Sequence, residues 1–293
     1  MDLSSAHAFM AGHARVLDRR RLELRLGQTD VTAVLSALDG YRNPDGGYGW
    51  GLEPDLRSPE SQPGGALHAF EVFADIAPAT SPRAAELCDW LDSITLPDGG
   101  LPFALPLTVK EATAPWWQDA DPTASSLQIT AITAAAAHRV AVHDPAVAKH
   151  PWLARATRYS LDTIAALDEK PFAYVLLFAV HLLDAVHDTH QEAPALLRKM
   201  TAHIPANGRV PVAGGTENEA LHPLDFAPTP TSRLRPHFTP EVIATDLDRL
   251  ASLQQPDGGW IVDYARISPS GTLDWRGVTT LNALHTLHTL QSN

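Results

Sequence analysis

Long apolar stretches alternate along the chain with short segments rich in glycine, proline and polar residues. The longest stretches cover residues 66–76, 124–142, 172–186 and 273–290. Runs of this length exceed a typical β-strand, and the leucines at 281, 284 and 287 recur at helical spacing. The dense alternation of apolar and polar residues that marks strands is not seen. The pattern therefore predicts an all-α protein.

A short turn motif recurs between these predicted helices. Its clear copies are Asn43-Pro44-Asp45-Gly46-Gly47-Tyr48, Leu96-Pro97-Asp98-Gly99-Gly100-Leu101 and Gln255-Pro256-Asp257-Gly258-Gly259-Trp260, with a weaker copy at 205–210. Their prolines stand at positions 44, 97, 205 and 256, which gives a period near fifty residues with one double step. We place the copy lost in the double step near residues 149–152. Proline fixes φ, aspartate stabilises a turn, and glycine permits positive φ.

A period of this length fits a helical hairpin with long loops. Hairpins stacked in an open row leave apolar faces at both ends, and closure into a ring buries those faces. We therefore predict a single all-α domain over residues 1–293, an α/α toroid (barrel) of about five to six helical hairpins. Residues 1–28 are expected to form an N-terminal helical extension. An open solenoid is the structural alternative.

Composition limits the classes of partner. The chain has 22 Lys and Arg against 34 Asp and Glu, a net charge of −12, which disfavours nucleic acid. The densest basic cluster, Arg19, Arg20, Arg21 and Arg25, is interpreted as a solvated helix face. No run of eighteen apolar residues and no hydrophobic signal core occur, so we expect no transmembrane segment and a cytoplasmic location. The single cysteine, Cys88, is expected to be a buried thiol on a helix.

The repeat carries a family resemblance. Leu253-Gln254-Gln255-Pro256-Asp257-Gly258-Gly259-Trp260 resembles the Gln-Trp repeat of squalene-hopene and oxidosqualene cyclases, and residues 43–50 resemble a variant of it. The likeness extends over residues 40 to 290. It implies the α/α toroid shared by terpene cyclases and prenyltransferases, a fold that hosts several chemistries.

A second resemblance concerns the reaction. Asp119-Ala120-Asp121-Pro122-Thr123-Ala124 is similar to the Asp-x-Asp-Asp-Thr-Ala segment of class II terpene cyclases, with Pro122 in place of the third aspartate. This implies that Asp121 is the catalytic proton donor and Asp119 its supporting carboxylate. The residues themselves leave another interpretation open, because aspartate followed by proline is an ordinary helix start.

The resemblance implies an isoprenoid-handling enzyme that starts cyclisation or isomerisation by protonation. Its substrate would be a hydrophobic small molecule. No cofactor or metal is expected, and Mg²⁺ enters only if a diphosphate is bound. Because class II cyclases generally hold substrate between two helical domains, a homodimer, a partner chain or the toroid's own centre would have to complete the pocket.

The loops that follow the turns carry aromatic and acidic residues, which repeat symmetry would gather around one mouth of the ring. The predicted substrate-binding residues are Trp50, Glu53, Asp55, Trp116, Trp117, His222, Asp225, Phe226 and Trp275. Aromatic walls can shield a cation, and paired carboxylates can divide acid and base roles. The same residues could instead close the hairpin junctions and contact solvent.

Two other function classes stay open. One is a carbohydrate-active α/α-barrel enzyme, with Glu53 and either Asp121 or Asp225 as its acid/base pair. The other is a non-catalytic binding or scaffold protein. A dry aromatic cavity would favour the isoprenoid hypothesis, and a polar groove with paired carboxylates would favour sugar. The proline-rich segment 223–240 is interpreted as a lid or a spacer, whose Arg233 and Arg235 could meet an anionic group.

Overall fold

Helices dominate the computed structural model, which describes residues 1–291 and the side chains of residues 1–288. Within that part of the chain only two short strands form, β1 (Val210–Pro211) and β2 (Ala220–Leu221), and they pair antiparallel. The all-α prediction is confirmed.

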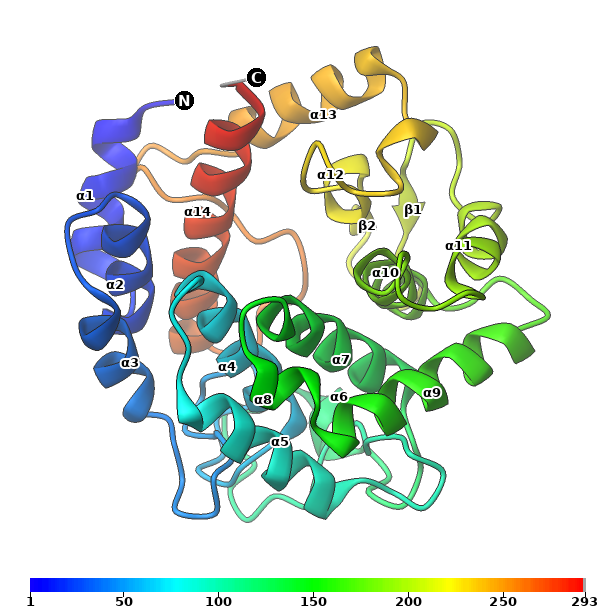
Figure 1. Cartoon of the computed structure of the whole chain (residues 1–293). Helices are drawn as coiled ribbons and strands as arrows, with labels where there is room; N and C mark the ends of the chain where they lie inside the picture. The colour runs from blue at the N-terminus through cyan, green and yellow to red at the C-terminus, as the bar shows by residue number, and fades with distance from the viewer. Residues whose placement is uncertain (292–293) are drawn as a thin grey trace.

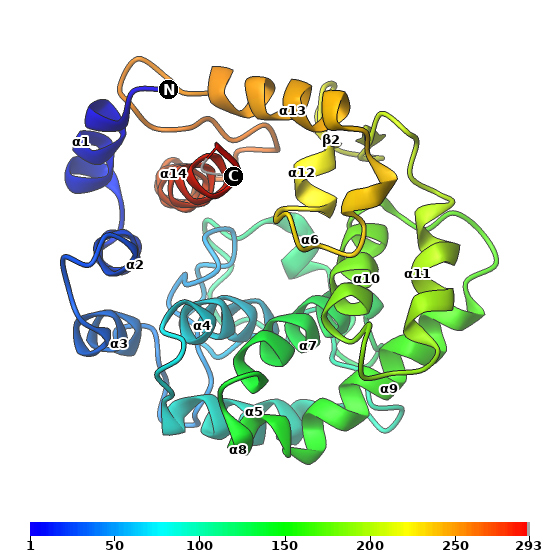
Figure 2. The ribbon, with the colours of Figure 1, turned by 45° about the horizontal axis from the view of Figure 1, so that its top comes forward.

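Most of the helices divide into a central and a peripheral group (Figure 2). The central helices are α4 (Pro63–Asp75), α7 (Leu127–Ala141), α10 (Ala173–Ala185), α12 (Pro223–Phe226) and α14 (Pro269–Gln291). The peripheral helices are α1 (Leu3–His13), α3 (Val31–Asp39), α5 (Pro82–Ile94), α9 (Pro151–Ala166), α11 (Ala193–Thr201) and α13 (Pro240–Ser252). Helix α2 (Val16–Arg25) lies between α1 and α3, and the short elements are α6 (Pro115–Gln118), α8 (Pro145–Ala148) and the 3-10 helix η1 (Arg235–His237).

The alanine-rich helix α7 forms the middle of the main core. Ser126 caps its start by accepting a hydrogen bond from the Ile129 N–H. Ala131 and Ala134 are fully buried, and such small side chains allow the neighbouring helices α4 and α10 to pack closely on either side.

The three clear turn motifs share one geometry. The aspartates at 45, 98 and 257 each accept a hydrogen bond from the N–H two residues later, at 3.0–3.1 Å. The first glycine of each motif has φ of +93° or +94°. The place assigned to the lost copy was wrong, because residues 149–152 lead directly from the end of α8 into α9, which begins at Pro151. By the order of helices the missing turn belongs at 167–172, where a short connection without glycine joins α9 to α10.

The last turn packs against the first helix. Gly46 lies against α5 and Gly99 against α9, and Gly258 lies in the same way against α1. Trp260 and Phe9, at 0% and 1% exposed, belong to one apolar cluster that also includes residues of α14. The two ends of the chain therefore lie together (Figure 1), and residues 1–28, which carry α1 and α2, pack into the fold.

Candidate active site

The main cluster of polar side chains joins the loop before α4 to α4 itself and to α14. Glu53 and Asp55 come from that loop, His68 and Glu71 from α4, and Trp275 from α14. The loop folds tightly because the Leu56 N–H donates to the Glu53 carbonyl and the Asp55 N–H donates to Glu53 Oε1 at 3.1 Å. Both carboxyl groups are thereby directed inward, where they are 7% and 5% exposed.

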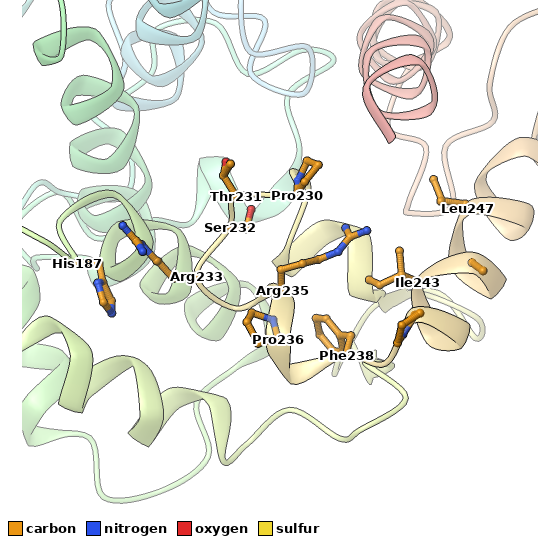
Figure 3. A pocket seen from close by; sticks show the side chains of 12 residues that line it. His187, Pro230, Thr231, Ser232, Arg233, Arg235, Pro236, Phe238, Ile243 and Leu247 are labelled. Carbon is orange, nitrogen blue, oxygen red and sulfur yellow. The ribbon is translucent and has the colours of Figure 1, made fainter. Parts of the chain in front are cut away.

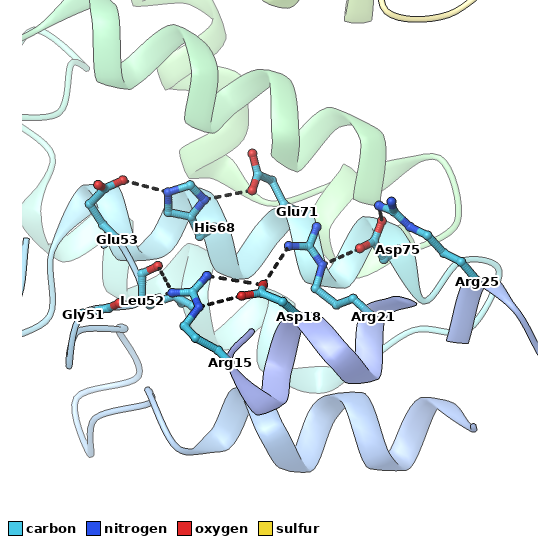
Figure 4. Close-up of polar contacts among 10 residues, drawn as sticks. All are labelled: Arg15, Asp18, Arg21, Arg25, Gly51, Leu52, Glu53, His68, Glu71 and Asp75. Carbon is cyan, nitrogen blue, oxygen red and sulfur yellow. Dashed lines mark hydrogen bonds and ion pairs between the residues drawn. The ribbon is translucent and has the colours of Figure 1, made fainter. Parts of the chain in front are cut away.

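His68 lies between two carboxylates (Figure 4). Its Nε2 is 2.8 Å from Glu53 Oε2, and its Nδ1 is 2.8 Å from Glu71 Oε2. Burial acts to lower the pKa of His68, but Glu71 and Glu53 raise it to about 10. Burial acts to raise the pKa of Glu71, but His68 lowers it to about 2. The imidazolium and the Glu71 carboxylate therefore stay charged at neutral pH.

The pKa of Asp55 is raised, in contrast to that of Glu71. Burial, and then the nearby charge of Glu53, raise its pKa to about 6, although a hydrogen bond from Trp275 Nε1 at 2.8 Å to Asp55 Oδ2 opposes the change. Its second oxygen, Oδ1, accepts no hydrogen bond within the described part of the chain. Asp55 thus holds a proton readily near neutral pH and has one oxygen free for a ligand.

Aromatic rings border these carboxyl groups. Trp275 meets His68 edge-to-face at a centroid distance of 5.8 Å and Tyr264 at 5.5 Å. Burial and the charges of Glu53 and Asp55 raise the pKa of Tyr264 well above its ordinary value, so its hydroxyl stays protonated. Trp275 and Tyr264 are only partly buried, so their rings present an aromatic surface beside the acid.

Glu71 of α4 and Arg139 of α7 lie on neighbouring helices next to this cluster. The Glu71 side chain is 30% exposed and Arg139 is exposed. Surrounding protein nevertheless desolvates both groups, which acts to raise the pKa of Glu71 and to lower that of Arg139. Burial lowers the pKa of Arg139, against the charges of Glu71 and two aspartates. Among the described residues its guanidinium has no hydrogen-bond or ion-pair partner, so Arg139 is an unpaired cation whose charge acts on the pKa of Glu71.

An ion-pair network supports the site from α2 (Figure 4). Asp18 binds Arg15 at 2.7 Å, and Asp75 of α4 binds Arg21 at 2.6 Å and Arg25 at 2.8 Å. Arg15 also donates to the Leu52 carbonyl at 2.9 Å, which fixes the loop just before Glu53. The interpretation of the basic cluster as a solvated face was therefore wrong for Arg21, which is 5% exposed.

Two of the predicted tryptophans, Trp50 and Trp116, are exposed, whereas the third, Trp117, borders the cluster next to Glu53. Trp50 is 58% exposed and its Nε1 donates to Asn43 at 2.8 Å. Trp116 is 44% exposed, whereas Trp117 is buried and stacks on Phe103 with centroids 4.4 Å apart. Of the nine predicted binding residues, the structure brings together Glu53, Asp55, Trp117 and Trp275. Trp117 belongs to this group because its ring and the Glu53 side chain lie 3.3 and 3.4 Å from the position that a Cβ on Gly64 would take.

His222 is the N-cap of the four-residue helix α12, and Asp225 and Phe226 are its last two residues. The His222 N–H donates to Asp225 Oδ2 at 2.7 Å in a capping box, and Phe226 is buried at 1%. Burial raises the pKa of Asp225 to about 6, and its backbone carbonyl lies 2.7 Å from His181 Nε2 on α10. This is a second carboxyl group that titrates near neutral pH, held by its own helix end.

Asp119 and Asp121 are exposed. Asp121 accepts hydrogen bonds from the Thr123 hydroxyl at 2.6 Å and the Thr123 N–H at 2.8 Å, and both lower its pKa. The helix-start interpretation was wrong, because α7 begins later, at Leu127, after its own Ser126 cap. Asp121 closes a local turn at the surface, and its carboxyl group favours the ionised form.

Sequence reasoning missed His68, Glu71 and Tyr264. The spacing of His68 and Glu71 at i and i+3 places them on one face of a helix, which could have indicated a pair. Within the described residues no group of three or more His, Cys, Asp and Glu is arranged to hold a metal ion. A search of those residues also finds no helix long and apolar enough to cross a membrane. Cys88 is buried, as expected.

Comparison of the sequence with protein-family models and with curated proteins finds no match.

Proposed function

We propose that the chain is a closed α/α toroid of five to six helical pairs. Each turn leads from a peripheral helix to a central one, and α1 occupies the place beside the last turn that α5 and α9 occupy beside earlier turns. The ring then buries the apolar face that an open row of hairpins would expose. Kinship with the terpene cyclase and prenyltransferase toroids is part of this proposal and is supported by the repeated turn motif.

We propose that the protein is an acid–base enzyme that cleaves a glycosidic bond in a polar saccharide. One observation carries this proposal. Asp55 is bonded to Trp275 and Glu71 to His68, and these two rings contact each other; the pKa values of the two carboxyl groups are displaced in opposite directions, to about 6 for Asp55 and about 2 for Glu71. Such separated pairs divide the roles of proton donor and permanent anion in glycosidases.

In this mechanism protonated Asp55 donates its proton to the glycosidic oxygen as the carbon–oxygen bond breaks. The Glu71 carboxylate stabilises the positive charge that develops on the sugar carbon. Water then adds to that carbon, and its proton returns to the Asp55 carboxylate. Trp275 and Tyr264 offer a surface on which a sugar ring can stack, and the imidazolium of His68 keeps Glu71 ionised and in place.

The isoprenoid hypothesis has less support from the environment of its acid. A group that protonates an alkene must be neutral and enclosed, whereas Asp121 is exposed and hydrogen bonds lower its pKa. The cluster around His68 is rich in charges and hydrogen-bonding groups, which suit a ligand with many hydroxyls better than a hydrocarbon.

The test is a substrate screen with paired variants. Purified protein would be incubated with aryl glycosides and soluble polysaccharides, and in parallel with farnesyl diphosphate, geranylgeranyl diphosphate and squalene, with products identified by mass spectrometry. We expect sugar release that falls about 100-fold or more in Asp55→Asn and is unchanged in Asp121→Asn. Because Asp55 acts in its protonated form, the rate should decline as pH rises through about 6.

The same screen separates the alternatives. Cyclised isoprenoid product that disappears in Asp121→Asn but persists in Asp55→Asn would reverse the assignment. No turnover of intact, soluble substrates would favour the scaffold hypothesis. Glu71→Gln provides a further check, because loss of the anion should lower the rate without removing the fall above pH 6.

A further inference from the structure

A cavity lies apart from the acid–base cluster and shares no lining residue with it. It is an open cleft of about 730 Å³ between the segment 230–238 and the first half of α13 (Figure 3). A volume of this size is within the range of pockets that hold small organic ligands. The proline-rich stretch that interrupts the helical repeat therefore forms a wall of a cavity.

The lining of this cleft combines apolar surface with positive charge. Pro236, Phe238, Ile243 and Leu247 supply apolar wall, and the cations come from the arginines at 233 and 235. Within the described part of the chain no carboxylate lines the cleft. The local charge is positive, although the whole chain carries a net charge of −12.

The two arginines differ in how their charge is balanced. Arg233 forms an ion pair with Asp188, and its backbone N–H donates to Asp184. The Arg235 guanidinium reaches only the Ala227 carbonyl, at 3.3 Å, and has no carboxylate partner among the described residues. Burial lowers the pKa of Arg235, and no acidic neighbour opposes that effect.

Arg235 is also directed at the open space. Figure 3 shows its side chain extending from the loop into the volume between Pro230 and Ile243. A half-buried guanidinium with one long hydrogen bond keeps most of its donors unused, and an oxyanion would satisfy them. The apolar walls beside it would at the same time cover a hydrocarbon chain or ring.

We propose that this cleft binds a small amphiphilic oxyanion, with its carboxylate or phosphate on Arg235 and its apolar part against Phe238, Ile243 and Leu247. The site is independent of the proposed glycosidic reaction. It selects ligands that have both a negative head group and an apolar body, because the head group alone contacts only the guanidinium and the apolar body alone contacts only the apolar wall.

The test uses three probes with the same eight-carbon chain: octyl phosphate, octanoate and octanol. Isothermal titration calorimetry on the full chain would give each dissociation constant, and inorganic phosphate would show what the head group contributes alone. We expect the two anions to bind at least tenfold more tightly than octanol and than inorganic phosphate. Equal binding of octanol and the anions would overturn the proposal.

Two variants and a matched control locate the site. Arg235→Gln should weaken octyl phosphate binding about tenfold or more and leave octanol unchanged, whereas Arg233→Gln, whose charge is already paired, should change it less than about threefold. Ala244→Glu places a negative charge on the exposed rim without disturbing the core, and should also weaken the anions selectively. Equal effects of the two arginine variants, or unchanged anion binding in Ala244→Glu, would contradict the assignment.

Discussion

Gly258 tests whether the last turn is held against the first helix. Its φ of +93° equals that of Gly46, so alanine at either position has the same backbone strain. The surroundings differ. A Cβ at 46 would lie 3.4 Å from the nearest atom, the Glu86 carbonyl oxygen, which is ordinary contact. A Cβ at 258 would collide with the Ser5 carbonyl on α1 and could fit only if the helix moved.

The magnitude follows from these two terms. Alanine in the left-handed region lowers the free energy of unfolding by about 1–2 kcal/mol in both variants. Overpacking against backbone lowers it by about a further 1–3 kcal/mol in Gly258→Ala only. For a chain of this length each kcal/mol corresponds to roughly 2 °C in Tm. Gly258→Ala should therefore melt about 2–6 °C below Gly46→Ala.

The assay is thermal and urea unfolding followed by circular dichroism at 222 nm, with both variants and the wild type at one protein concentration. If Gly258→Ala and Gly46→Ala lose the same stability, the contact between the last turn and α1 is not formed in solution, and the closed ring fails with it.

Three further predictions concern burial and charge. The pKa of His68 is raised from 6.5 to about 10, so its contribution to the free energy of unfolding is complete below pH 6.5 and is lost as pH rises to about 10. Urea titrations should show that the free energy of unfolding falls by roughly 4–5 kcal/mol between pH 6.5 and about 10. The variant His68→Gln should be less stable than the wild type at pH 7, and its free energy of unfolding should not show this fall. A parallel fall in the variant would contradict the assignment. Trp152 is fully buried and stacks on Phe70 with centroids 6.0 Å apart, so Trp152→Ala should cost about 3–5 kcal/mol in urea unfolding, and a loss below about 1 kcal/mol would show that the α4–α9 packing is wrong. Burial raises the pKa of the Cys88 thiol, so Ellman's reagent should react with it only upon unfolding; rapid labelling of the native protein would place the thiol at the surface.

The helices and turns follow from local sequence. Proline, aspartate and glycine at fixed spacing give the same hydrogen bonds and the same positive φ at three separate places, since every group involved lies within a few residues. The long apolar runs likewise indicate helices without knowledge of their partners. Local rules failed at Asp121, where the predicted helix begins six residues later, because Ser126 provides the actual cap.

The candidate site depends on contacts that the sequence does not reveal. Asp55 receives its hydrogen bond from Trp275, 220 residues away, and its displaced pKa comes from burial by elements that meet only in the folded chain. His68 reads in the sequence as one histidine on an apolar helix, and only packing places Glu53 opposite Glu71 around it. Hydrogen bonds between neighbouring residues can be predicted from the local sequence. Desolvation and long-range charge arise when distant segments exclude water together, so the tertiary structure alone decided which carboxyl group has a raised pKa.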